Sequence, residues 1–226
     1  RGHTLAVSCC CFSPDGERAL SASGDHTIKL WRIADGGLKR TFEGHRSGVF
    51  HCSFSPDGER VLSASNDQTL KLWRIADGSM EKSFDLHTDL CTCCCFSPDG
   101  SRVLSASFDK TLRLWSVASG AATSLVGHSS FVLWCCFSPD GARCLSASSD
   151  HTLKLWRAED GTVERTLQGH TDRVSCCCFS PEGGLVLSAS RDRTLRLWSS
   201  TDGALLAVLA GHADDVTRCC ASPDGT

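Results

Sequence analysis

The chain has 226 residues, of which 41% are hydrophobic, 22% are charged and 16 are cysteine, and its formal net charge is −3. The hydrophobic content allows a packed core, and no apolar run reaches the roughly 20 residues that a membrane-spanning helix needs. Both signs of charge are spread along the whole chain, which argues against a protein that binds nucleic acid or a membrane surface through a basic stripe.

Six near-copies of one segment follow one another, and each opens on a histidine: His3, His45, His87, His128, His170 and His212. Their spacings are 42, 42, 41, 42 and 42 residues, a period typical of repeat proteins. We expect one domain of repeats at about residues 2–43, 44–85, 86–126, 127–168, 169–210 and, in part, 211–226. Because the chain starts inside a repeat at Arg1 and ends one strand into the sixth copy, we expect a piece of a longer protein.

Each complete copy carries four short strand signals. In the first copy they lie at residues 7–12, 19–23, 27–31 and 38–42, separated by turn residues such as Pro14-Asp15-Gly16. Nothing has the pattern of a long amphipathic helix. Four antiparallel strands make one twisted sheet, and radial repetition of such sheets predicts an all-β propeller.

The chain resembles the WD-repeat β-propeller family. The resemblance rests on Gly-His, Ser-Pro-Asp-Gly and Asp-x-Thr-x-x-Leu-Trp segments that recur along the chain. It implies five complete blades and the first strand of a sixth, from a native domain of seven or more. Three features depart from the family pattern. Leu86 replaces the glycine before His87, blade 3 has one residue fewer between Trp115 and His128, and other residues replace the Asp after each Trp: Arg32, Arg74, Ser116, Arg157 and Ser199.

The resemblance also implies a hydrogen-bonded tetrad in each blade, with Ser21 as the serine of the first and Ser23 as its alternative. The five expected tetrads are His3, Ser21, Asp25, Trp31; His45, Ser63, Asp67, Trp73; His87, Ser105, Asp109, Trp115; His128, Ser146, Asp150, Trp156; and His170, Ser188, Asp192, Trp198. Ser, His and Asp are also the residues of a hydrolase triad. Their recurrence at fixed offsets, together with a Trp, favours a structural role, and we expect no enzyme activity.

The cysteines recur at equivalent positions, the clearest being seven residues after each His: Cys10, Cys52, Cys94, Cys135, Cys177 and Cys219. Such residues are expected to act as small buried hydrophobes. Equivalent strands of neighbouring repeats are expected to lie too far apart for disulfides, which favours reduced thiols in the cytoplasm or nucleus. Adjacent cysteines on a strand point to opposite faces, so the runs at 9–11, 93–95 and 176–178 do not predict a metal site. We expect no metal and no cofactor.

Functional information is expected where the copies differ. The variable positions lie near the start of the first strand and directly before the tetrad Asp, which we call the hairpin Asp because it follows the second strand. At these positions apolar residues occur in blades 2 to 4 and arginines occur at blade 5: Phe50, Leu90, Phe108, Phe131, Leu133, Trp134, Arg173 and Arg191. Such residues are typical of binding surfaces, although some of them could instead fill gaps between blades. The prediction is a non-catalytic scaffold that binds proteins or peptides within a larger complex or chain, with no direct contact to nucleic acid or membrane. The alternative is a sensor or autoinhibitory propeller of a larger signalling ATPase, similar to those of apoptosome- and NACHT-type proteins.

Overall fold

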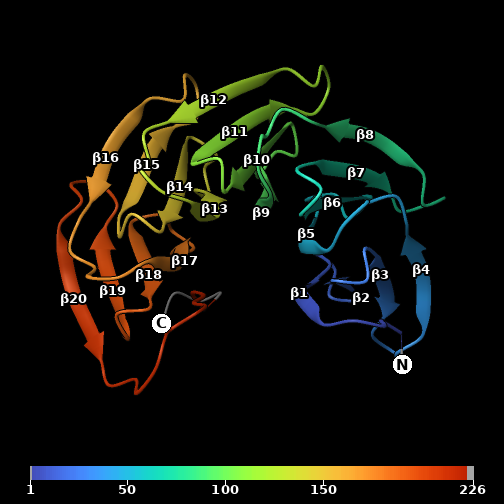
Figure 1. The fold of residues 1–226 in the computed structure, drawn as a ribbon, viewed down its shortest axis with the longest axis horizontal. Coiled ribbons are helices and arrows are strands. Elements are labelled where there is room, and N and C mark those ends of the chain that lie inside the picture. Colours follow the sequence, from blue (N-terminus) through green and yellow to red (C-terminus); the bar gives the residue numbers. More distant parts are fainter. Residues whose placement is uncertain (1, 223–226) are drawn as a thin grey trace.

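The computed structural model describes residues 2–222 and arranges them in five four-stranded antiparallel sheets, or blades. Within each blade every strand pairs with the next in sequence, as in the order β1-β2-β3-β4. Figure 1 shows the blades side by side in an arc, with the first strand of each blade innermost and the fourth outermost. The predicted all-β propeller architecture is therefore confirmed. None of the described residues belongs to a helix with the length and hydropathy that crossing a bilayer requires.

The strand bounds repeat from blade to blade. They are β1 Val7–Phe12, β2 Arg18–Ser23, β3 Ile28–Arg32 and β4 Leu38–Phe42; β5 Val49–Phe54, β6 Arg60–Ser65, β7 Leu70–Arg74 and β8 Met80–Phe84; β9 Cys91–Phe96, β10 Arg102–Ser107, β11 Thr111–Ser116 and β12 Ala122–Val126; β13 Val132–Phe137, β14 Arg143–Ser148, β15 Leu153–Arg157 and β16 Val163–Leu167; β17 Val174–Phe179, β18 Leu185–Ser190, β19 Thr194–Ser199 and β20 Leu205–Ala210. The strands predicted in the first copy agree with these bounds to within one residue.

The hydrophobic core lies between consecutive blades, at interfaces that we call seams. The trailing face of a blade points to the next blade, and the leading face points to the preceding one. In the first seam, Leu20, Ile28 and Phe42 of blade 1 pack against Val49 and Trp73 of blade 2, and all five are buried. Alternation along each strand supplies both faces, because successive side chains point to opposite sides of the sheet.

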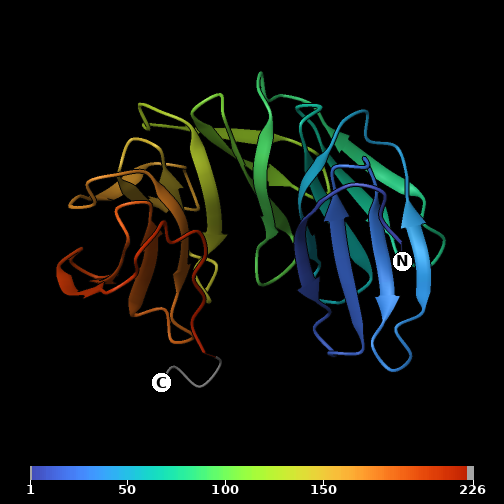
Figure 2. The same ribbon diagram turned by 60° about the horizontal axis from the view of Figure 1, so that its bottom comes forward.

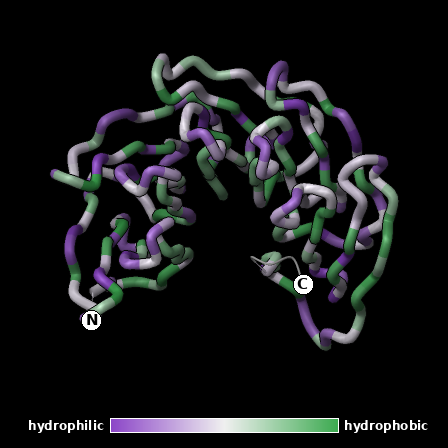
Figure 3. Tube along the Cα trace, turned by 180° about the vertical axis from the view of Figure 1, so that it is seen from behind, coloured by the Kyte–Doolittle hydropathy of each residue, from purple (hydrophilic) through white to green (hydrophobic). Residues whose placement is uncertain are grey.

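The two ends of the arc expose the residue types that the seams bury. On the leading face of blade 1, Val7 is 54% exposed, whereas its equivalent Val49 is 1% exposed. On blade 5, Leu209 is 49% exposed, whereas its equivalent Leu167 is 1% exposed. Figure 3 shows β20 as an apolar run on the outside of the arc. Figure 2 shows the two end blades facing each other across the opening.

The first strand of the sixth copy, expected from the sequence, does not form among the described residues. Residues 211–222 contain no strand, and residues 223–226 lie outside the described residues. The segment nevertheless takes the place of a sixth blade's first strand, since the Val216 N–H donates to the carbonyl oxygen of Ser190 at 3.2 Å and Val216 is buried. In every complete blade the first strand is hydrogen-bonded to a second one, whereas residues 211–222 have no such partner strand among the described residues.

The shorter third copy has a local structural effect. In blades 1, 2, 4 and 5 the pairing of the third and fourth strands shifts by one residue next to the Trp. In blade 3 the pairing of β11 with β12 is regular from Thr111–Val126 to Trp115–Ala122. The missing residue is therefore a β-bulge residue, and blade 3 keeps its fold without it.

We expect the exposed and buried copies of one leucine to differ sharply in their effect on stability. Leu167→Ala leaves a cavity in a sealed seam and should lower the free energy of unfolding by about 3 kcal/mol. Leu209→Ala, at the equivalent exposed position, should lower it by less than about 1 kcal/mol. Urea unfolding followed by tryptophan fluorescence measures both, and equal losses would contradict the assignment of the core to the seams.

Candidate functional site

The four residues of each expected tetrad are joined by hydrogen bonds in all five blades. In blade 3, His87 Nδ1 lies 2.7 Å from Asp109 Oδ2, His87 Nε2 lies 2.7 Å from Ser105 Oγ, and the Trp115 indole N–H donates to Ser105 Oγ at 2.9 Å. The equivalent bonds in the other four blades are also 2.7–2.9 Å long. The serine is the one predicted, since Ser21 joins the first tetrad, whereas Ser23 donates to the carbonyl oxygen of Leu5.

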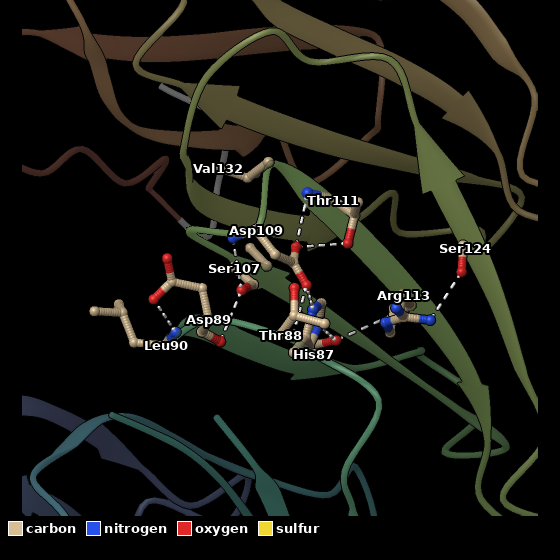
Figure 4. A network of polar contacts seen from close by, with 12 residues as sticks. His87, Thr88, Asp89, Leu90, Ser107, Asp109, Thr111, Arg113, Ser124 and Val132 are labelled. Atoms are coloured by element: carbon tan, nitrogen blue, oxygen red, sulfur yellow. Dashed lines mark hydrogen bonds and ion pairs between the residues drawn. The ribbon is translucent and has the colours of Figure 1, made fainter. Parts of the chain in front are cut away.

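The aspartate of each tetrad organises two turns at once. Figure 4 shows Asp109 between His87, Thr88 and Thr111. Its Oδ2 accepts the Thr88 N–H at 3.2 Å, and its Oδ1 accepts both the N–H and the hydroxyl of Thr111, at 2.9 and 2.6 Å. Burial raises the pKa of the Asp109 carboxyl, but the hydrogen bonds from His87 and Thr111 outweigh it and hold this pKa well below its usual range. The tetrad therefore fixes the loop before the first strand to the hairpin after the second.

The serine of the tetrad is in the wrong place for a nucleophile. Ser105 is fully buried, and its hydroxyl oxygen already meets both the Trp115 indole and the His87 ring. A substrate carbonyl would have to displace the indole from a sealed seam to reach that oxygen. The tetrad connects the strands and loops of one blade, and a buried network whose hydrogen-bonding groups all have partners makes a sheet rigid.

The propeller face at the hairpin-Asp end carries an ordered series of residue pairs. The residue before the hairpin Asp of one blade lies beside the third residue after the His of the next. Phe108 and Phe131 are such a pair, and their rings stack with centroids 4.3 Å apart and an interplanar angle of 8°. Arg191 and Asp215 are another, with Arg191 Nε 3.1 Å from Asp215 Oδ2. We call these pairs seam pairs.

The glycines of the first seam show the same geometry. A Cβ built on Gly48 would lie 3.3 Å from the Cα of Gly24 and 3.7 Å from Asn66 Nδ2. The two positions thus stay adjacent even without side chains. Contacts define three seam pairs, Gly24/Gly48, Phe108/Phe131 and Arg191/Asp215. The repeat places Asn66/Leu90 and Ser149/Arg173 at the equivalent positions of the other two seams.

Backbone hydrogen bonds link one seam pair to the next. The Phe108 N–H donates to the carbonyl oxygen of Leu90 at 3.1 Å, and the Ser149 N–H donates to that of Phe131 at 2.9 Å. Leu90, Phe108, Phe131 and Ser149 therefore follow one another across blades 3 and 4. Phe131 is 40% exposed, while Leu90 and Phe108 are half-buried. The three apolar residues form a continuous strip that we call the aromatic strip.

Phe50 and Leu133 occupy a different kind of position. Each is the extra residue of a β-bulge, because Val49 and His51 pair with successive residues of β6, and Val132 and Trp134 with successive residues of β14. A bulge re-aims the side chain that it carries. Phe50 is 38% exposed and Leu133 is half-buried.

The two predicted arginines differ in their partners. Arg191 is exposed and forms the ion pair with Asp215, so its charge is compensated. Arg173 is half-buried, and its side chain has no ion pair among residues 2–222. Of these two arginines, only Arg173, one seam beyond Phe131, therefore has no acidic partner in the described part of the chain.

Trp134 lies in the central channel instead of beside the aromatic strip. Its ring meets His51 of blade 2 edge-on, with centroids 4.9 Å apart, and the Arg218 guanidinium carbon lies 4.3 Å from the centroid of the indole. Trp134 also packs against the buried Cys176 of blade 5. The sequence pattern missed this contact because it joins residues 83 and 84 positions apart across the axis of the arc.

All sixteen cysteines are free thiols. Within residues 2–222, no three His, Cys, Asp or Glu side chains gather as a metal ion would require. The innermost strands nevertheless approach closely, since the Cys11 thiol donates to the carbonyl oxygen of Cys52 in the next blade at 3.5 Å. The expected wide separation of these strands is therefore wrong, because the channel brings the first strands of adjacent blades together.

Removing the tetrad carboxylate should destabilise the protein in a pH-dependent way. Asp109→Asn leaves His87, Thr88 and Thr111 with one acceptor oxygen instead of two and should lower the free energy of unfolding by about 2–3 kcal/mol at pH 7. A carboxylate with a lowered folded-state pKa stabilises above its unfolded pKa near 4, and that stabilisation is lost as the pH falls through the folded value.

The difference between wild type and Asp109→Asn should therefore be smaller at pH 3 than at pH 7, as measured by urea unfolding at both. Asp85→Asn, at an exposed position, is the control and should change little. A difference that grows toward pH 3 would contradict the assigned role of Asp109.

Comparison with known proteins gives a consistent result along the chain. The family described as "WD domain, G-beta repeat" matches residues 1–32, 36–74, 78–116, 121–157, 161–199 and 203–226. The internal matches run from the outer strand of one blade through the first three strands of the next.

Individual relatives match over about one repeat. WD repeat, SAM and U-box domain-containing protein 1 of Gallus gallus is 44% identical over 43 residues, which are 19% of this chain and 9% of that protein. MST50-interacting protein 11 of Pyricularia oryzae is 50% identical over 42 residues, 19% of this chain and 13% of that protein. An uncharacterized WD repeat-containing protein of Synechocystis is 54% identical over 41 residues, 18% of this chain and 12% of that protein. The matched stretch thus spans only about a tenth of each relative, while the family match extends over nearly all of this chain. The chain belongs to the WD-repeat family, whose members serve in general as scaffolds for protein interactions.

Proposed function

We propose that this protein is a non-catalytic scaffold that binds an extended segment of a partner protein across blades 3 to 5. The observation that carries the proposal is the Phe108–Phe131 stack, which is partly open to solvent at the hairpin-Asp face. A stacked pair of this kind loses little side-chain entropy on binding, because each ring already rests on the other. Aromatic residues of this type are typical anchors of protein interfaces.

The chemistry of the partner segment follows from the order of the seam pairs. An apolar or aromatic side chain would pack on the aromatic strip of Leu90, Phe108 and Phe131. An acidic side chain would then reach Arg173, which is in the next seam and has no ion pair among the described residues. Beyond it, Arg191 is already neutralised by Asp215 and offers little attraction to a further carboxylate. We infer a partner with an apolar anchor followed by one carboxylate.

The alternative role as the sensor or autoinhibitory propeller of a signalling ATPase stays a prediction of the sequence. It depends on a nucleotide-binding domain outside these 226 residues. The same aromatic strip would then bind a segment of the longer chain.

A random peptide display library, screened against the purified protein, tests the proposal directly. We expect enriched peptides to pair an aromatic or aliphatic residue with an acidic one. Phe108→Ser combined with Phe131→Ser should weaken binding of those peptides at least 10-fold, measured by fluorescence anisotropy, because the loss of a central anchor commonly exceeds 1.4 kcal/mol.

Val163→Ser is the matched control, because Val163 is 41% exposed on the outer strand of blade 4 and Phe131 is 40% exposed. It should leave the affinity unchanged. Arg173→Gln should weaken only the peptides that carry an acidic residue. Equal affinity of the double variant and wild type, with both folded by circular dichroism, would refute the aromatic strip as the docking site.

A further inference from the structure

The runs of three cysteines lie on the innermost strands, where cysteines of neighbouring blades meet in the seams. Cys52 of blade 2 is the seventh residue after His45. It packs with Cys9 and Cys11 of blade 1, which are the sixth and eighth residues after His3. The Cys9 and Cys11 thiols of blade 1 donate to the carbonyl oxygen of Cys52 in blade 2 at 3.8 and 3.5 Å, and the Cys93 thiol of blade 3 donates to that of Cys135 in blade 4 at 3.5 Å. The Cys52 side chain is buried in the core cluster of the same seam, and Cys9 and Cys11 pack against that cluster.

One thiol of the first set, Cys11, lines a cavity, whereas the half-buried Cys9 and the exposed Cys10 do not. A cavity of about 650 Å³ opens at the Ser-Pro-Asp-Gly end of the channel, opposite the aromatic strip. It is lined by the eighth residue after the His in every complete blade: Cys11, Ser53, Cys95, Cys136 and Cys178. Cys11 is half-buried on the wall of this cavity, whereas Cys52 behind it is fully buried. A small reagent in the cavity would thus meet Cys11 first.

The environments of the two thiols favour different protonation states. The hydrogen bond from Cys52 lowers the pKa of the Cys11 thiol against the opposing effect of burial. Hydrogen bonds to Cys11 and Cys9, followed by burial, raise the pKa of the Cys52 thiol well above its usual value. The thiolate is the nucleophile in reactions of cysteine, so Cys11 is the more reactive member of the pair and Cys52 keeps its proton.

We propose that Cys11 and Cys52 form an oxidation site in which a hydroperoxide that enters the cavity converts the two thiols into a disulfide between blades 1 and 2. The Cys11 thiolate attacks the peroxide O–O bond and becomes a sulfenic acid, while the departing oxygen takes up a proton and leaves as water or an alcohol. Oxidation removes the negative charge of Cys11, which is one cause of the raised pKa of Cys52. The Cys52 thiol can then lose its proton as its sulfur attacks the Cys11 sulfur, and the sulfenic oxygen leaves as water with that proton. Two thiols are oxidised by two electrons, and one peroxide is reduced.

One further seam should form the same kind of disulfide, and another seam lacks the cysteines that a disulfide requires. Cys95 lines the same cavity and packs against the core cluster that contains Cys135 of the next blade, so this pair should respond in the same way. In the second seam the sixth and eighth positions are His51 and Ser53, and the Cys94 sulfur lies 3.8 Å from His51 Nδ1. Cys94 should therefore form no disulfide with blade 2.

The test is mild oxidation of the purified protein with hydrogen peroxide, alkylation of the remaining thiols, digestion with trypsin and mass spectrometry without reductant. Trypsin separates the peptide of residues 2–18, with Cys11, from that of residues 47–60, with Cys52. We expect a cross-linked species lighter than the two peptides together by two hydrogen atoms. The oxidised protein should also unfold about 5 °C or more higher, because a cross-link restricts the unfolded chain, and dithiothreitol should reverse this shift.

Cysteine variants show which two thiols form the disulfide. Cys9→Ser and Cys10→Ser should keep the cross-link, and Cys11→Ser should lose it. Cys52→Ala should leave a sulfenic acid on Cys11 that dimedone traps, and this readout does not require the disulfide to form. Loss of the cross-link in Cys9→Ser but not in Cys11→Ser would overturn the assignment. Oxidation confined to the exposed Cys10 and Cys220, with no cross-linked peptide, would overturn the proposal itself.

Discussion

A blade of this protein buries its apolar faces only against another blade, and the rest of the structure follows from that constraint. The leucines and phenylalanines of one trailing face fill the space left by the valines, cysteines and tryptophan of the next leading face. The tetrads hold each sheet rigid enough for such faces to match, since every tetrad ties the loop before the first strand to the hairpin after the second. Stability is thus a sum over blades and seams rather than a property of one central core.

The same constraint separates two functional surfaces. At the hairpin-Asp end the first strands begin, and the residues that meet across a seam there are free to vary because the tetrad beneath them carries the structure. At the Ser-Pro-Asp-Gly end the first strands finish, and the cavity there is lined by cysteine, serine, proline and phenylalanine residues. Binding of a protein segment is proposed at the first end and thiol chemistry at the second, so one need not disturb the other.

Much of this could be predicted from the sequence. The repeat period, the turn residues and the alternation of apolar residues gave the blades and their strands to within one residue in the first copy. The seam pairs could not be predicted, because Phe108 and Phe131 belong to different copies and only the relative placement of two blades shows that they stack. Trp134 was misplaced for the same reason, since its partners His51 and Arg218 lie across the channel. Local sequence patterns predict the contacts of a residue within its own blade. They do not predict contacts between residues of different blades.

The division of each seam pair between two copies has a consequence for how such a face can evolve. If one copy is exchanged or duplicated as a whole, it brings its own third residue after the His and its own residue before the hairpin Asp. Two adjacent seam pairs then change together, while every tetrad stays intact, because its four members come from a single copy. Recombination between near-identical repeats can therefore change the recognition surface in steps of one blade while every tetrad stays intact.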